Sequence, residues 1–231
     1  MIYCISDIHG KYDLFCRLMD SIGFNAGDEL LVLGDMTDKG LQTVRLCNLL
    51  RSEPNIHCIT GNHEYDFLKA YYAAMKKEDA DFDRVLDSLR EYFPGDGKEL
   101  CWEIIDWLES LPFFIEREDF VCVHAGIAVD GQNGVLLPDK TLPEEFVYSR
   151  KLSRSALLPD GCKCVIFGHT PVACSSGENR ILFYPRTPEL FHSGTITDYC
   201  KIHIDTGAYL TGVLGCLRTD DCRDFYAFEK P

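Results

Sequence analysis

The sequence predicts a mixed α/β domain (α+β in some classifications) in which helices cover a buried sheet. Three observations support this fold class: strands and helices alternate over residues 1–60, the centre of the chain is helical, and the second half returns to strands. Of the 231 residues, 46% are hydrophobic and 26% are charged, which is typical of a globular protein with a sizeable core. We therefore expect a single domain over residues 1–231, with a helical insertion at about residues 64–111.

The first elements alternate in type. Residues 1–6, 29–34 and 55–60 are short apolar runs of the kind that form buried strands. Residues 11–24 and 41–52 carry apolar side chains at helical spacing, and a glycine ends the first of these helices. This β-α-β-α-β order predicts a sheet with helices packed on it.

The remaining elements are helices followed by strands. Helices are expected at residues 65–77, 79–93 and 98–111, and a Pro-Gly-Asp-Gly turn separates the last two. No internal repeat or linker interrupts the pattern. Strands are then expected at residues 113–118, 120–126, 162–170, 180–185, 201–207, 212–219 and 224–230.

Charge and composition exclude several function classes. The net charge of −14 argues against nucleic-acid polymers and anionic membranes as partners, because phosphate backbones and acidic headgroups attract basic proteins. A phosphorylated substrate would need local positive charge, which metal ions can supply. The N-terminus has strand character, not signal-peptide character, and no apolar run reaches the length of a membrane span. We expect a cytoplasmic protein whose twelve cysteines are mostly reduced.

Polar, metal-type side chains follow five of the expected strands. Sites in α/β proteins gather beyond the carboxyl ends of strands, and each of these segments also contains glycine, which lets backbone and ligand approach closely. The five segments are Asp7-Ile-His9-Gly10, Gly34-Asp35-Met36-Thr37-Asp38-Lys39-Gly40, Gly61-Asn62-His63-Glu64, His124-Ala125-Gly126 and Gly168-His169-Thr170.

Each of these residues has an ordinary structural explanation when it is taken alone. An Asp after a strand usually forms a turn or caps a helix, and a single His is more often a surface or core residue than a ligand. Five such segments at one topological position are hard to explain as coincidence. Carboxylate, imidazole and amide oxygen favour Mn, Fe or Zn over Ca or Mg, and six ligands suit two ions that share a carboxylate.

These five segments, in order, resemble the signatures of the phosphoprotein phosphatase branch of the calcineurin-like metallophosphoesterases, and residues 204–208 are similar to the bacterial and phage serine/threonine phosphatases. The resemblance covers Asp7 to about Ala208. It implies a central β-sandwich flanked by helices, with a dinuclear metal site at one edge. It also implies two divalent ions, of which Mn is expected first, with Fe and Zn as alternatives.

The resemblance further implies a role for each matching residue. Asp7, His9 and Asp35 would hold one metal; Asp35, Asn62, His124 and His169 would hold the other. A hydroxide that bridges the metals would attack phosphorus in line, and His63 would protonate the leaving oxygen while Asp38 orients its imidazole. Asn62 would also contact the phosphate.

One of the residues expected to bind phosphate differs from the pattern of the family. The family usually has Arg where this chain has Lys39, and Lys supplies a point charge where Arg supplies two parallel hydrogen bonds. Arg150 resembles a second phosphate-binding Arg, although Lys151 and Arg154 lie close in the sequence. Glu64 is expected to cap its helix and to take no part in chemistry.

The sequence leaves three functions open. The first is a serine/threonine protein phosphatase, which the pairing of Asp38 with His63 favours, because a serine alkoxide leaves poorly without an acid. The alternative is a hydrolase of dinucleoside polyphosphates or other small phosphoesters, whose family members usually lack an Asp at the position of Asp38. The third is a binding protein that has kept the fold and lost catalysis.

Overall fold

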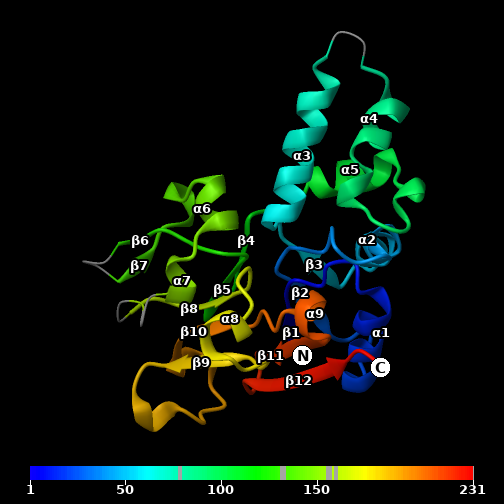
Figure 1. Ribbon diagram of the computed structural model, residues 1–231. Helices are drawn as coiled ribbons and strands as arrows, with labels where there is room; N and C mark the ends of the chain where they lie inside the picture. Colours follow the sequence, from blue (N-terminus) through cyan, green and yellow to red (C-terminus); the bar gives the residue numbers. More distant parts are fainter. Residues whose placement is uncertain (78–79, 131–133, 155–157, 159–160, 231) are drawn as a thin grey trace.

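Two five-stranded sheets stack face to face, and helices cover the two outer faces (Figure 1). The structure, a computed structural model, describes residues 1–77, 80–130, 134–154, 158 and 161–230. It confirms the mixed α/β class, and the predicted strands are present with bounds that differ by one to a few residues.

The first sheet has the order β12-β11-β1-β2-β3. The strands β1 (Ile2–Ile5), β2 (Glu29–Val32) and β3 (Ile56–Cys58) run parallel to one another. The strand β11 (Val213–Arg218) pairs antiparallel with β1, and β12 (Arg223–Phe228) pairs antiparallel with β11. The chain end therefore completes the sheet that the N-terminus begins.

The second sheet has the order β4-β5-β8-β10-β9. Its three central strands, β5 (Phe120–Val123), β8 (Cys164–Phe167) and β10 (Tyr199–His203), are parallel. The edge strands β4 (Phe114–Glu116) and β9 (Leu182–Pro185) are antiparallel to their neighbours. Each sheet thus contains three neighbouring parallel strands, and the loops at their carboxyl ends can form a site.

Alternate side chains of the central strands face two different cores. In β1, Cys4 belongs to the core between the sheets, whereas Tyr3 and Ile5 face the helices on the first sheet. In β8, Ile166 lies between the sheets and Val165 faces outward. This alternation follows from the two-residue period of a strand, and because both faces are covered the strands are apolar throughout.

Helices complete the outer layers. The helices α1 (Tyr12–Ile22) and α2 (Thr43–Ser52) bury Leu14, Phe15 and Leu46, among others, against the first sheet. The short helices α6 (Pro143–Tyr148) and α7 (Lys151–Arg154) cover the second sheet. The helix α1 ends at Gly23 in a left-handed conformation, as the sequence predicts.

Three helices stand together at the top of Figure 1, beyond the edge of the first sheet. They are α3 (Asn62–Met75), α4 (Phe82–Ser88) and α5 (Trp102–Glu109), and they share the core under α1 and α2. The predicted helix 79–93 is shorter than expected, because Asp81 caps it through the Arg84 N–H; Asp79 lies outside the described residues. The insertion at about residues 64–111 within a single domain stays our prediction.

Several short elements were not predicted. They are the strands β6 (Val129–Asp130) and β7 (Val135–Leu136), the helices α6, α7, α8 (Ala173–Ser176) and α9 (Ala208–Thr211), and 3-10 turns at Arg90–Tyr92, Gly97–Glu99, Pro138–Lys140, Pro188–Leu190 and Ile196–Asp198. All twelve cysteines are free thiols. Within the described ranges, every helix is too short or too polar to cross a bilayer.

Candidate active site

The five polar segments meet where the parallel strands of both sheets end. Backbone hydrogen bonds join them: the N–H of His9 donates to Asp35 O at 2.9 Å, and the N–H of Gly168 donates to His124 O at 2.8 Å. The first bond links the loops after β1 and β2, and the second links those after β5 and β8. The hydrogen bond from the His169 N–H to Asp7 Oδ2, at 3.0 Å, then links the loops of the two sheets at one shared site.

The carboxylate of Asp35 lies at the centre of this site. Its Oδ2 is 3.7 Å from His9 Nε2 and 3.7 Å from His63 Nε2, and its Oδ1 is 3.5 Å from His124 Nε2. Two groups of candidate metal ligands share this residue: His9, Asp35 and His63 form one, and Asp35, His124 and His169 form the other. One carboxylate with donors on both sides is the arrangement that can bridge two cations.

The second group also includes an amide oxygen. Oδ1 of Asn62 lies 2.8 Å from His169 Nδ1 and 3.1 Å from His124 Nε2, and these two ring nitrogens are 3.2 Å apart. Asn62 is the first residue of α3, and its placement follows directly from the end of β3. Three donor atoms thus converge on one small region.

Backbone carbonyls fix the orientation of two of the imidazoles. Nδ1 of His124 is 2.8 Å from Leu33 O, and Nδ1 of His9 is 2.9 Å from Thr37 O. A carbonyl oxygen can only accept, so each Nδ1 carries the proton and donates it. In the neutral form of either ring, Nε2 then carries the lone pair, on the side of Asp35, which is the state that a metal ligand needs.

Asp7, in the loop after β1 of the first sheet, contacts the loop that follows β8 of the second sheet. Its Oδ2 accepts hydrogen bonds from the His169 N–H, at 3.0 Å, and from the Ser6 hydroxyl. Asp7, His9 and His169 line a small cavity of about 40 Å³. The structure therefore brings all six predicted metal ligands together, and it places His63 among them as well.

Burial and charge make this site suited to cations. The pKa of Asp35 lies well above its usual value, because the carboxylate is buried and the charges of Asp7 and Glu64 are close. Burial lowers the pKa of His9 to about 4 and that of His169 to about 3, so both rings are neutral at pH 7. Crowded buried carboxylates beside neutral imidazoles fit divalent ions, which would relieve the repulsion between the acids.

His63 and Asp38 form a separate contact at the edge of the site. Nδ1 of His63 donates to Asp38 Oδ2 at 2.7 Å. Burial opposes the charged imidazole, but the hydrogen bond to Asp38 and the charge of Asp35 outweigh it and raise the pKa of His63. A half-buried imidazole whose pKa is raised holds its proton to higher pH and can donate it to a leaving group.

Both predicted phosphate-binding cations are exposed, and Lys39 contacts a predicted metal ligand. Nζ of Lys39 is 3.0 Å from His9 Nε2, on the side that would face a cation. Arg150 is exposed, and its charge is one of the lesser causes, after burial, that lower the pKa of His169. A Cβ on Gly126 would come within 2.5 Å of Ser149, so glycine lets the segment before Arg150 approach His124.

The backbone is strained where the predicted site residues lie. Among the described residues, the non-glycine residues with positive φ are Asp7, His9, Asp35, Asp38, Lys39, His169 and Cys222. All but Cys222 are predicted site residues. Left-handed backbone costs free energy for such residues, so its concentration here indicates a functional constraint.

Glu64 has a larger structural role than its sequence position suggests. Its carboxylate accepts hydrogen bonds from the N–H groups of Gly61, Asp35, Met36 and Thr37 at 2.8–2.9 Å. It caps α3, as predicted, and it also holds the loop after β2 in place. This second role could not be predicted from the sequence, because the partners are backbone groups of a distant loop.

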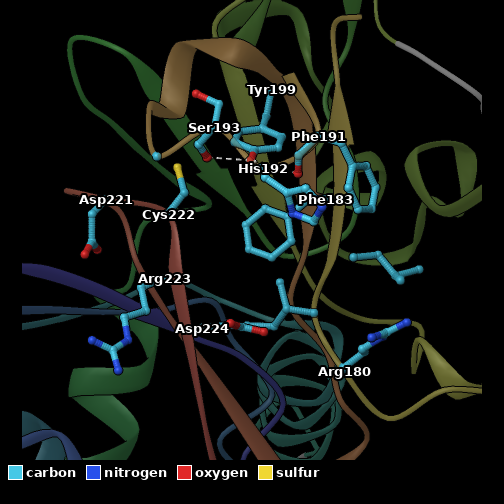
Figure 2. A pocket seen from close by; sticks show the side chains of 13 residues that line it. Arg180, Phe183, Phe191, His192, Ser193, Tyr199, Asp221, Cys222, Arg223 and Asp224 are labelled. Carbon is cyan, nitrogen blue, oxygen red and sulfur yellow. Dashed lines mark hydrogen bonds between the residues drawn. The ribbon is translucent and has the colours of Figure 1, made fainter. Parts of the chain in front are cut away.

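A much larger cavity lies apart from this site. Figure 2 shows this cavity, of about 570 Å³, with Phe183, Phe191 and His192 on one side and Arg180 and Arg223 on the other. It opens between β9 and the start of β12, and none of the predicted site residues lines it. The site beyond the strand ends is therefore narrow and polar, and it was identified by its side chains and not by its size.

Comparisons with known proteins agree with this geometry. Residues 1–190 match the family described as calcineurin-like phosphoesterase. A symmetrical bis(5'-nucleosyl)-tetraphosphatase of Neisseria meningitidis serogroup A is 33% identical over 131 residues, which cover 54% of this chain but only 43% of that protein. The chain thus matches less than half the length of this relative.

Two further comparisons cover more of the chain. The asymmetrical bis(5'-nucleosyl)-tetraphosphatase PrpE of Bacillus velezensis is 29% identical over 207 residues, which cover 77% of this chain and 80% of that protein. A solved structure named as a putative diadenosine tetraphosphatase has the same fold, with a TM-score of 0.69 and 17% identity over 98% of this chain and 92% of that one. The match over residues 1–190 identifies the chain as a member of the calcineurin-like phosphoesterase family.

Proposed function

We propose that this phosphoesterase hydrolyses dinucleoside polyphosphates, with diadenosine tetraphosphate as the model substrate. The observation that carries the hydrolase assignment is the pair of ligand groups that share Asp35. The substrate class is supported by the names of relatives, which include both symmetrical and asymmetrical tetraphosphatases. The sequence alone favours a serine/threonine protein phosphatase and leaves a dinucleoside polyphosphate hydrolase as the alternative. We now place that alternative first.

The proposed roles are those that the family resemblance implies, and the positions of the side chains support them. Asp7, His9, Asp35, Asn62, His124 and His169 would hold two divalent cations, of which Mn is our first candidate. Such ions, when bound, polarise a phosphate group and acidify a water molecule. Lys39 and Arg150 would attract the phosphate chain, and Asn62 would contact the reacting phosphate. His63, oriented by Asp38, would give its Nε2 proton to the oxygen of the leaving phosphate.

One observation supports a second candidate, a serine/threonine protein phosphatase. The 2.7 Å contact between His63 and Asp38 favours the protonated imidazole, which can act as a general acid, and a serine alkoxide needs such an acid more than a leaving nucleotide phosphate does. The two candidates share all metal ligands and differ in what the leaving group requires.

A comparison of two substrates tests the proposal. Purified protein loaded with Mn²⁺ is assayed on diadenosine tetraphosphate and on a phosphoserine peptide, with a His124→Ala variant as the control for contaminating enzymes. We expect kcat/KM to be at least about tenfold higher for the dinucleotide, and the control to be inactive. Phosphate release from the peptide without turnover of the dinucleotide would establish the second candidate instead. No turnover of either substrate would favour the binding protein.

A further inference from the structure

A basic cavity lies next to the catalytic site, at the beginning of α1. Its volume is about 410 Å³, which is within the range of small-molecule pockets, about 300–1,000 Å³. The basic side chains that line it are Lys11, Arg17 and Lys230, and the acidic ones are Asp13 and Glu229. For a protein with a net charge of −14, three cations around one cavity are a local exception.

Arg17 and the helix end both offer hydrogen-bond donors in this cavity. Arg17 lines the cavity and is partly buried; its Nε has no hydrogen-bond partner but is closed off from solvent, so a bound anion would be held by the Nη atoms of the guanidinium group. No side chain caps the first turn of α1, so its N–H groups can bind an anion. The exposed side chain of Leu41 adds an apolar surface at the same cavity.

Tyr209 connects this cavity to the catalytic site. Its ring lines the small cavity that holds Asp7, His9 and Lys39, and it is 45% exposed. Lys11, which lines the basic cavity, contacts this ring: its Nζ lies 5.5 Å from the centre of the Tyr209 ring. The same Nζ lies 3.0 Å from Glu229 Oε1. Lys11 directly follows Gly10, at the end of the loop that carries Asp7 and His9. A continuous path of cations and one aromatic ring thus leads from Lys39 to Arg17.

We propose that the cavity bounded by Lys11, Arg17, Leu41 and Lys230 binds the distal phosphates and nucleoside of a dinucleoside polyphosphate. The inference rests on the function proposed above. The reacting phosphate lies at Asp35, the polyphosphate chain passes Tyr209 and Lys11, and Arg17 and the first turn of α1 bind the far phosphates. Leu41 offers an apolar surface for the base or ribose. A simple phosphomonoester has no distal phosphates or second nucleoside to place in this cavity.

The test is a substrate ratio. We measure kcat/KM for diadenosine tetraphosphate divided by kcat/KM for p-nitrophenyl phosphate in the wild type and in Arg17→Gln. The loss of hydrogen bonds to a charged phosphate should lower this ratio about tenfold. Lys230→Gln, an exposed change that does not threaten folding, should lower it severalfold. Melting temperatures check that both variants fold.

Two matched controls make the result specific. Arg84→Gln removes the same charge from the exposed surface of α4, and Arg223→Gln removes it from the cavity of Figure 2. Both should leave the ratio unchanged. Equal substrate ratios in the wild type, Arg17→Gln and Lys230→Gln would overturn the proposed subsite and leave the proposed function standing. A substrate ratio that falls in Arg223→Gln alone would have the same meaning. A wild type that cleaves p-nitrophenyl phosphate but not the dinucleotide would overturn both proposals.

Discussion

At the scale of single residues, the contact between Asp38 and His63 determines which leaving groups the site can serve. The hydrogen bond to Asp38 raises the pKa of His63 against the effect of burial. Asp38→Asn would remove the charge that keeps the imidazole protonated. An alkoxide needs that proton, whereas a leaving phosphate, whose second pKa is about 6, can carry its charge at pH 7.

We therefore expect Asp38→Asn to lower kcat about 100-fold on a phosphoserine peptide, if the peptide is turned over, and less than about tenfold on diadenosine tetraphosphate. Steady-state kinetics of both substrates at pH 7 measure this difference. Asp83→Asn, an exposed change on α4, is the control and should affect neither rate. Equal losses on the two substrates would show that Asp38 acts on the whole site and not through the acid.

The residues of the site were predictable because their signal is local. Asp35, Asn62 and His169 each follow an apolar strand and lie beside a glycine, and strand ends gather at one place in an α/β fold. The contact between Lys39 and His9 could not be predicted in the same way, because it depends on the path of two loops. Sequence patterns indicate which residue types meet, but not which atoms point at one another.

At the scale of elements, Glu64 joins α3 to the loop after β2. Its carboxylate accepts hydrogen bonds from the backbone of Asp35, Met36, Thr37 and Gly61, and from the Thr37 hydroxyl. Glu64→Gln keeps the shape but leaves one accepting oxygen, and its NH₂ group would face N–H donors. The N–H groups that lose their acceptor stay buried, which is more costly than the loss of an exposed hydrogen bond.

We expect Glu64→Gln to lower the free energy of unfolding by about 2–4 kcal/mol, as measured by urea denaturation of the metal-free protein. The matched control is Glu91→Gln, which makes the same change at an exposed position and should alter stability by less than about 0.5 kcal/mol. If the two variants unfold at the same urea concentration, the loop does not depend on Glu64.

The elements themselves were predictable in proportion to their length. The apolar runs that became β1, β2 and β8, and the helical spacing of α1 and α2, were sufficient to predict them. The two-residue strands β6 and β7 and the four-residue helices α8 and α9 are too short to show a period. These short elements form because the chain must turn between longer ones, which is a consequence of the tertiary structure.

At the scale of the whole molecule, the stacking of two sheets could not be derived from residue patterns. The strands are apolar on both faces, and a strand of that kind fits a single sheet covered by helices equally well. The two-sheet arrangement was implied only by the family resemblance, and the structure shows it through the shared core of Cys4, Leu31 and Ile166. The core decides which face of each strand meets the other sheet, and that is a property of the assembled fold.

The stability of this fold in acid depends on a buried histidine. His203, in β10, is fully buried, and its ring stacks on Phe167 at 4.4 Å between centroids. Burial lowers its pKa from 6.5 to about 4, although nearby backbone carbonyls favour the charged form slightly. Below pH 6.5 the unfolded chain therefore binds a proton that the folded protein does not, so stability falls as the pH drops from 6.5 to about 4.

At pH 5 this one residue should account for about 2 kcal/mol of lost stability relative to pH 7.5. His203→Phe keeps the aromatic stack and removes the titrating group, so its loss of stability between these pH values should be smaller by that amount. Urea denaturation of the metal-free protein at both pH values measures the difference, and the exposed His192→Phe variant is the control. The same pH dependence in His203→Phe and the wild type would mean that His203 is already charged in the fold, in contradiction of its burial between the strands of the second sheet.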